Sequence, residues 1–164
     1  MFGGSRAGGL SKGAPDSRPT GSTRTGMGAQ MRQRRIVVFE DQANLHDLYR
    51  HGLASLGAVE IHLRPELALD QVADADLVVT DLEMPGMGGL GLLRWMREQE
   101  LLMPTLLVTA APEGEAFKAA RALADAVLAK PFGLRQLRET ARELLESPDA
   151  VHEGRPVRST CRVV

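Results

Sequence analysis

Five short apolar runs alternate with helical patterns along most of this chain, and this alternation constrains the fold more than any other feature. The runs span residues 35–39, 59–63, 77–80, 105–109 and 126–129, and each has the length of a buried strand. Between them, apolar residues recur every three to four positions, as they do on one face of a helix. Such an alternation predicts an α/β fold in which helices cover both faces of a parallel sheet.

The helices that this pattern predicts span residues 42–56, 66–72, 90–99, 113–123 and 134–146. Gly57 follows the first and Pro148 follows the last, which is where these residue types commonly end helices. The second helix is the shortest. On the last helix we expect the inner face to carry Leu134, Leu137, Ala141, Leu144 and Leu145.

Composition divides the chain into one ordered domain, expected at residues 34–147, and two tails. Residues 1–33 are rich in Gly, Ser and Arg and lack a periodic apolar pattern, so we expect a disordered N-terminal tail. Residues 148–164 are expected to form a C-terminal tail. The net charge is −1, there is one cysteine, and no apolar run approaches the roughly 20 residues that span a bilayer. We therefore expect a cytoplasmic protein that binds neither nucleic acid nor a membrane.

Polar side chains stand where the predicted strands end. Glu40 and Asp41 follow the first run, Asp81 follows the third, Thr109 ends the fourth and Lys130 follows the fifth. In an open parallel sheet, ligands bind beyond the carboxyl ends of the strands where the strand order reverses. Neighbouring carboxylates repel one another unless a cation compensates, and Mg²⁺ prefers oxygen ligands. The sequence therefore predicts a site for a divalent cation and a phosphoryl group.

This arrangement resembles the response-regulator receiver domain, the CheY-like module of two-component signalling, over about residues 34–146. The resemblance rests on four motifs in order: Glu40-Asp41, the segment DLEMPGMGG that begins at Asp81, Thr109-Ala110, and Lys130-Pro131-Phe132. It implies a flavodoxin-like (CheY-like) three-layer sandwich, with a five-stranded parallel sheet of order 2-1-3-4-5 and five helices.

The resemblance also implies roles for these residues in phosphoryl transfer. Asp81 would accept a phosphoryl group from a phosphohistidine on a histidine kinase or histidine phosphotransfer protein, forming an aspartyl phosphate. Lys130 and Thr109 would bind phosphoryl oxygens, and the small Ala110 would leave room for them. The Lys130–Pro131 peptide bond is expected to be cis, as it is in the family.

A magnesium site is implied beside the phosphoacceptor. Asp41, Asp81 and the backbone carbonyl of Glu83 would ligate Mg²⁺ directly, and Glu40 would hold it through water. The expected function is a single-domain response regulator that signals through protein–protein interaction or phosphorelay to an unknown downstream target. Such a protein is a switch and not a metabolic enzyme.

Two other functions remain open. A phosphorylation-independent pseudo-receiver is suggested by Val127, where the family commonly carries an aromatic switch residue, and by the acid Glu83 two positions after Asp81. An aspartyl-phosphate phosphohydrolase could use Glu83 as an acid-base. The glycines between Gly86 and Gly91 also fit a dinucleotide-binding pattern, but they follow the third strand instead of the first, which argues against it.

Three arginines at helical spacing, Arg135, Arg138 and Arg142, predict an exposed basic stripe on the last helix. The stripe is a candidate partner surface. Ordinary ion pairs with Glu139 and Glu146 are the alternative, because each lies four residues from an arginine.

Overall fold

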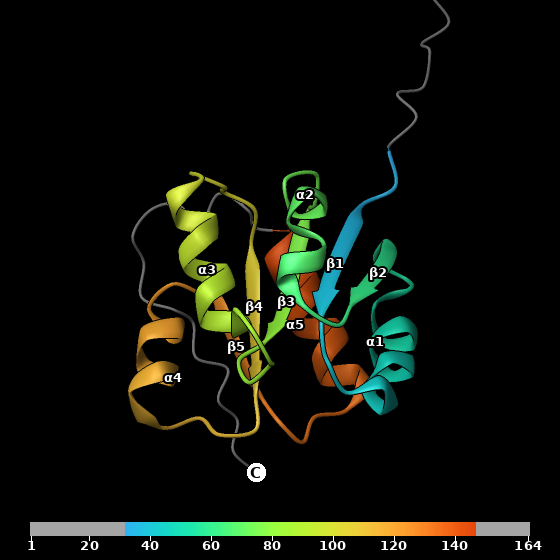
Figure 1. The fold of residues 1–164 in the computed structure, drawn as a ribbon. Helices are drawn as coiled ribbons and strands as arrows, with labels where there is room; N and C mark the ends of the chain where they lie inside the picture. The colour runs from blue at the N-terminus through green and yellow to red at the C-terminus, as the bar shows by residue number, and fades with distance from the viewer. Residues whose placement is uncertain (1–31, 147–164) are drawn as a thin grey trace, which may run out of the picture. The chain divides into compact units, whose positions relative to one another are not determined.

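The computed structural model describes residues 32–146, which form a five-stranded parallel sheet between two helical layers (Figure 1). The strands are β1 (Arg35–Phe39), β2 (Ala58–His62), β3 (Leu77–Asp81), β4 (Thr105–Thr109) and β5 (Ala126–Ala129). Their order is β2-β1-β3-β4-β5, and each neighbouring pair is parallel, which confirms the predicted fold. The two predicted tails fall almost entirely outside the described residues.

The helices are α1 (His46–Leu53), α2 (Leu69–Val72), α3 (Gly88–Glu98), α4 (Gly114–Arg121) and α5 (Leu134–Glu146). Three of them, α1, α2 and α4, are shorter than the sequence predicts. A 3₁₀ turn, Ala43–Leu45, precedes α1, and another, Pro65–Leu67, precedes α2. Ala68 separates the second turn from α2 because its backbone angles, φ −150° and ψ 31°, are not helical. Apolar periodicity alone does not distinguish such a broken segment from one helix.

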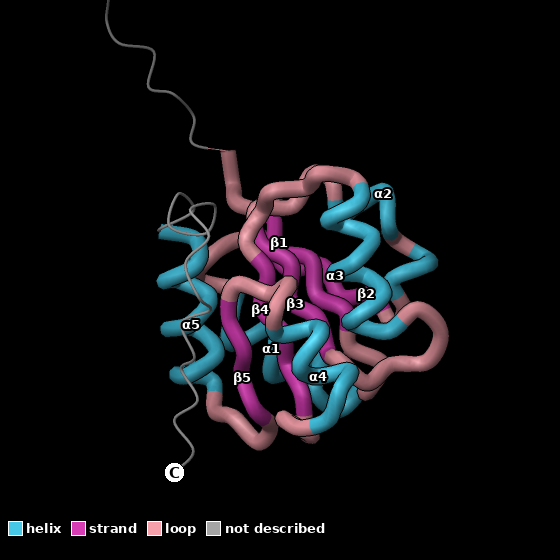
Figure 2. The backbone as a smooth tube through the Cα atoms, turned by 90° about the vertical axis from the view of Figure 1, so that its left-hand side faces the viewer, coloured by secondary structure: helices cyan, strands magenta, loops and turns pink. Residues whose placement is uncertain are grey.

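Four of the strands, β1, β3, β4 and β5, are buried on both faces, which explains their near-continuous apolar sequences, whereas the edge strand β2 is only partly buried. Ile36 and Val38 of β1 pack in the core beneath α1 and α5, whereas Val37 and Phe39 pack toward α2 and α3. Figure 2 shows α5 on one side of the sheet and α2, α3 and α4 on the other. Leu134, expected on the inner face of α5, opens the helix with its side chain near Gly52 of α1, but it is 43 % exposed and lies outside the buried core.

The strand order reverses between β1 and β3. From β1 the chain passes outward to the edge strand β2, and from β3 it passes in the opposite direction to β4. Phe39 pairs with Thr80 in the β1–β3 register, so the next residues along each chain, Glu40 and Asp81, are brought together. The topology therefore places the predicted acidic residues at the crevice where ligands bind in this class of sheet.

Gly89, in the first turn of α3, lets that helix approach the end of β3 closely. A Cβ atom there would collide with the carbonyl oxygen of Asp81 and lie 3.0 Å from the Cα of Leu82. We expect Gly89→Ala to lower the free energy of unfolding by about 1–2 kcal/mol, since the cost of overpacking exceeds the gain in helix propensity. Urea denaturation measures this change.

Gly133→Ala is the matched control, because no atom lies within 4 Å of a Cβ added at Gly133. We expect that variant to stay within about 0.5 kcal/mol of the wild type. Equal stability of the two variants would contradict the close approach of α3 to Asp81.

Candidate functional site

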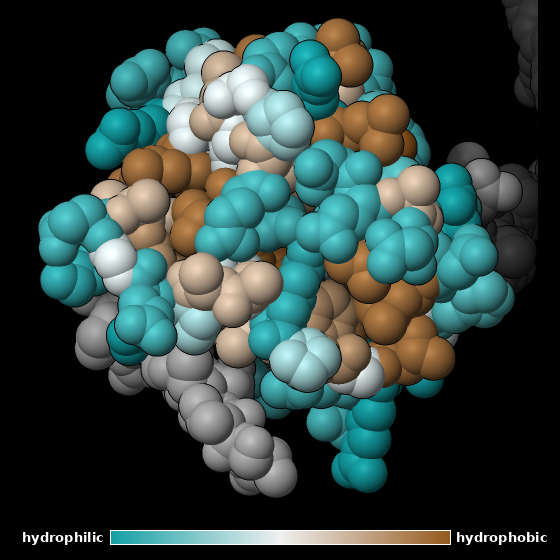
Figure 3. Space-filling view, turned by 60° about the horizontal axis from the view of Figure 1, so that its bottom comes forward, coloured by the Kyte–Doolittle hydropathy of each residue, from teal (hydrophilic) through white to brown (hydrophobic). Residues whose placement is uncertain are grey.

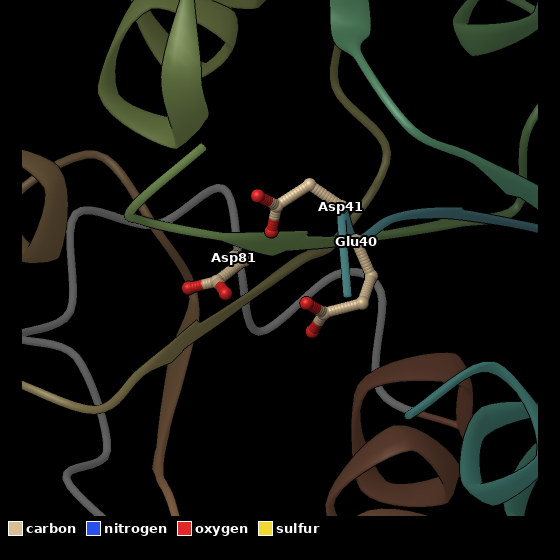
Figure 4. A group of neighbouring side chains, drawn as sticks. All are labelled: Glu40, Asp41 and Asp81. Atoms are coloured by element: carbon tan, nitrogen blue, oxygen red, sulfur yellow. The ribbon is translucent and has the colours of Figure 1, made fainter. Parts of the chain in front are cut away.

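Three carboxyl groups converge at the ends of β1 and β3 (Figure 4). Glu40, Asp41 and Asp81 each offer an oxygen within 4.8 Å of the others. Glu40 is fully buried, Asp81 is 1 % exposed and Asp41 is half-buried. Like charges at this spacing and burial repel one another strongly, so the arrangement requires positive charge nearby.

Lys130 supplies one such charge from the end of β5. Its Nζ lies 2.6 Å from Asp81 Oδ2 and 2.9 Å from Glu40 Oε2. The following peptide bond, Lys130–Pro131, is cis, as predicted. Burial by itself lowers the pKa of Lys130, but its hydrogen bonds to Asp81 and Glu40 outweigh that effect, and the pKa is raised overall. The lysine is therefore charged at neutral pH and bridges two carboxylates.

The Asp41 carboxylate has a feature that indicates a metal-binding site. Among the residues that the structure describes, Asp41 Oδ1 is buried yet has no hydrogen-bond partner. Burying a carboxylate oxygen without a partner costs free energy unless a bound ligand interacts with that oxygen. When ionised, three carboxylates and one ammonium leave two negative charges, which a divalent cation would neutralise. An all-oxygen donor set of this kind fits Mg²⁺.

Glu40 is held by several groups that the sequence did not reveal as part of the site. Its Oε1 accepts a hydrogen bond from the backbone N–H of Gln42 at 3.1 Å, and its Oε2 accepts one from the Tyr49 hydroxyl at 3.1 Å. His46 Nε2 lies 2.9 Å from the Glu40 carbonyl oxygen. Burial and, next, the Glu40 carboxylate raise the pKa of Tyr49, so the phenol remains a donor.

A signal for Tyr49 was present in the sequence. It lies on the apolar face of the predicted first helix, and a buried phenol usually finds a hydrogen-bond partner. The apolar face indicated burial, but it did not identify Glu40 as the partner. That assignment depends on how α1 packs beside β1.

Thr109 and Glu83 lie beside the acidic cluster. The Glu83 N–H donates to Asp81 Oδ1 at 3.2 Å, while Glu83 Oε1 lies 3.5 Å from the Thr109 hydroxyl, at the outer limit of a hydrogen bond. Thr109 is fully buried, and its hydroxyl accepts from the Ala111 N–H at 3.0 Å. Its carbonyl accepts from the Lys130 N–H at 2.8 Å. The structure thus brings all six predicted site residues to one end of the sheet.

The family model of the response regulator receiver domain matches residues 36–142, most of the described chain. The chain belongs to the receiver domain family. Members of this family act as phosphoacceptor switches in two-component signalling and bind Mg²⁺ at an acidic pocket.

Named relatives agree with this assignment. The chain is 30 % identical to the chemotaxis protein CheY of Pseudomonas aeruginosa over 119 residues, which cover 68 % of this chain and 96 % of CheY. It is 32 % identical over 130 residues to DctD of the same organism, a C4-dicarboxylate transport transcriptional regulatory protein. That match covers 77 % of this chain and only 28 % of DctD.

Solved structures agree as well. The BeF₃-activated DrrB receiver domain has a TM-score of 0.64 at 25 % identity, covering 70 % of this chain and 98 % of that domain. A CheY-like receiver domain protein from Methanospirillum hungatei has a TM-score of 0.65 at 24 % identity, covering 72 % and 98 %, which supports the fold alone.

This chain has Val127 at the position where the family commonly carries an aromatic switch residue, and the structure shows where that valine packs. Val127 is 1 % exposed and packs in a cluster that includes Leu107, Phe117 and Ala120. It is therefore a core residue between β5 and α4. The swing of a large ring cannot transmit phosphorylation from this position.

The prediction that Arg138 belongs to an exposed basic stripe on α5 is wrong. Its guanidinium donates to the carbonyls of His51 and Gly52, at 3.1 Å and 3.0 Å, in the last turn of α1. Carbonyls at a helix C-terminus need such donors, so Arg138 links α5 to α1. Arg135 forms an ion pair with Glu139 at 2.8 Å, which is the alternative that the sequence left open.

The end of the receiver domain toward which the strands point has a mixed surface. Figure 3 shows hydrophilic side chains there with hydrophobic groups between them. Within residues 32–146, no helix is both long enough and apolar enough to cross a membrane.

Proposed function

We propose that this receiver domain is a Mg²⁺-dependent phosphoacceptor, and that Asp81 takes the phosphoryl group from a phosphohistidine on a histidine kinase or histidine phosphotransfer protein. One observation carries the proposal: the buried Asp81 carboxylate lies 2.6 Å from Lys130 Nζ and within 4.8 Å of a carboxylate oxygen of Asp41, whose Oδ1 is buried without a partner. These contacts support the proposed roles of Asp81 as the nucleophile, of Lys130 as the cation for the transferred group and of Asp41 as a metal ligand.

In the proposed reaction an Asp81 carboxylate oxygen attacks phosphorus while the bond from phosphorus to the histidine nitrogen breaks. The imidazole leaves with that electron pair and takes up a proton. Lys130 shifts from its bridge between two carboxylates to a phosphoryl oxygen, and the Thr109 hydroxyl turns from Glu83 to donate to another. Such chemistry needs positioning and charge neutralisation more than acid-base catalysis.

Mg²⁺ would neutralise the negative charge that gathers on the phosphoryl oxygens during transfer. Asp41, Asp81 and the Glu83 carbonyl are the proposed direct ligands, with Glu40 acting through water. Glu40 suits an indirect role because its carboxylate already accepts from Tyr49, Gln42 and Lys130.

We further propose that residues 34–147 are the functional unit, that it works in the cytoplasm, and that its output is protein–protein interaction or phosphorelay. The proximity of Asp81, Lys130 and Thr109 supports a phosphoacceptor over a pseudo-receiver. Neither the pseudo-receiver nor the phosphohydrolase is favoured by a specific contact, since the Glu83 carboxylate lies toward Thr109 and its N–H binds Asp81.

The test is incubation of the wild-type chain with acetyl phosphate, with and without Mg²⁺, followed by intact mass measurement. We expect the wild type to gain one phosphoryl group only when Mg²⁺ is present. Asp41→Asn should need at least about tenfold more Mg²⁺, because it removes a proposed ligand. Asp47→Asn, which changes an exposed carboxylate on α1, should behave as the wild type.

Two results would contradict the proposal. A wild-type chain that binds Mg²⁺ but never gains phosphoryl mass would favour the pseudo-receiver. Rapid multiple turnover of diverse phosphate esters would favour the phosphohydrolase.

A further inference from the structure

Helix α3, which follows the proposed phosphoacceptor, has no side-chain cap of its own. Met87 is its N-cap residue, no side chain from the cap position bonds the first turn, and that turn contains no acidic residue. The first N–H groups of a helix need acceptors, and negative charge is stabilising at this end. An acceptor from another part of the chain would therefore affect where α3 begins.

Glu66 provides that acceptor from the 3₁₀ turn before α2. Its Oε1 accepts a hydrogen bond from the Met87 N–H, across 21 residues of sequence. The contact resembles a capping box, in which a glutamate reaches back to the N–H of the cap residue, but here the glutamate belongs to a different segment. Figure 2 shows α2 and α3 on the same side of the sheet, which makes this contact between segments feasible.

Gly86 makes room for the Glu66 carboxylate. Its φ of +85° lies in the left-handed region that favours glycine, and a Cβ atom at this position would collide with Glu66 Oε1. Hydrogen bonds from its own backbone N–H and from Met87 lower the pKa of Glu66, so the carboxylate stays ionised. The loop geometry and the acceptor therefore fit each other.

The same loop carries the proposed metal ligand Glu83. At its start, the Glu83 N–H is bound to Asp81 Oδ1 at 3.2 Å, and the Leu82 carbonyl accepts from the Gly89 N–H at 3.2 Å. Toward its end, Met87 is held by Glu66. The segment between Asp81 and α3 is thus tied both to the site and to a neighbouring element of the fold.

We propose that Glu66 is a positioning residue for the magnesium and phosphoryl site: by capping α3 at Met87, it holds the loop that presents the Glu83 carbonyl beside Asp81. This rests on the proposed function, which makes that carbonyl a ligand. Coupling between two sites is reciprocal, so Mg²⁺ binding and the Glu66–Met87 hydrogen bond strengthen each other. The segment between β2 and α2 is thereby linked to the state of the site.

The experiment compares Glu66→Ala, Glu66→Gln and the control Glu98→Ala, which removes an exposed carboxylate from the opposite end of α3. Mg²⁺ affinity is measured by calorimetry, and exchange of the Met87 amide hydrogen is followed by NMR. We expect Glu66→Ala to weaken Mg²⁺ binding about 3- to 10-fold, somewhat less than loss of a residue that contacts a ligand directly. Glu66→Gln keeps the acceptor oxygen, so we expect it and Glu98→Ala to remain within about twofold of wild type.

Exchange of the Met87 amide provides a second readout. It should be faster in Glu66→Ala than in wild type, and Mg²⁺ should slow it in wild type. If Glu66→Ala fails to fold, Glu66→Asp withdraws the oxygen from Met87 by one methylene and allows the same comparison.

Two results would overturn the inference. In the first, Glu66→Ala has a lower free energy of unfolding but an unchanged Mg²⁺ dissociation constant, which would show a purely structural role. In the second, Mg²⁺ binding is weakened equally in Glu66→Ala, Glu66→Gln and Glu98→Ala, which would show an effect of net charge alone. A wild-type chain that binds no Mg²⁺ would instead overturn the proposed function, and Met87 exchange would still decide whether Glu66 holds the loop.

Discussion

Asp81→Asn is expected to lose all measurable phosphorylation by acetyl phosphate or by a phosphohistidine donor. An amide lacks the negatively charged oxygen that attacks phosphorus, while its shape and its acceptor for the Glu83 N–H are retained. Intact mass measurement with Mg²⁺ at saturation detects the loss. The fold should persist, which circular dichroism can verify on the same sample.

Asp70→Asn is the control for Asp81→Asn, because Asp70 is an exposed carboxylate on α2. That variant should be phosphorylated at the wild-type rate. Phosphorylation of Asp81→Asn at a similar rate would place the acceptor on another residue and refute the proposed role of Asp81.

Lys130→Ala is expected to lower the free energy of unfolding by about 3 kcal/mol in the absence of Mg²⁺, because removing one partner leaves buried charges uncompensated. The affected groups are Glu40 and Asp81, whose side chains are 0 % and 2 % exposed. Urea denaturation in EDTA measures the loss. Added Mg²⁺ should restore part of the stability by binding the folded state.

The pH dependence of this effect follows from the raised pKa of Lys130. Its stabilising contribution is complete below its ordinary pKa of 10.5 and is lost only as the pH rises through the higher value of the folded state. The difference in the free energy of unfolding between wild type and Lys130→Ala should therefore not vary with pH across the neutral range through titration of Lys130.

Lys118→Ala is the control, because Lys118 forms an exposed ion pair with Glu115. We expect it to lower the free energy of unfolding by at most about 1 kcal/mol. Equal losses in the two variants would contradict the buried bridge.

The site residues could be predicted because each lies at the carboxyl end of a strand or within two residues of it. The alternation of apolar runs indicated a parallel sheet, and the ends of such strands meet at one edge. The order 2-1-3-4-5, however, came from the resemblance to a family and not from the apolar pattern. Asp41, Asp81 and Lys130 were therefore recognisable as a set before their distances were known.

Groups that support the site from other elements were not predictable in the same way. Tyr49 was recognised as buried but not as a donor to Glu40, and Arg138 was placed on a free surface although it binds α1. The cap that Glu66 provides for α3 joins residues with no sequence pattern in common. Each of these contacts depends on the relative position of two packed elements.

By itself, the sequence determined that this chain has an α/β core and carries the pair Glu40-Asp41, Asp81 and Lys130 at strand ends. These properties follow from local periodicity and from the order of residues along each strand. Only the tertiary structure decided that Lys130 bridges Glu40 and Asp81 and that one Asp41 oxygen is buried without a partner. The reason is physical: hydrogen-bond partners and burial depend on the packing of segments distant in sequence, which local patterns do not specify.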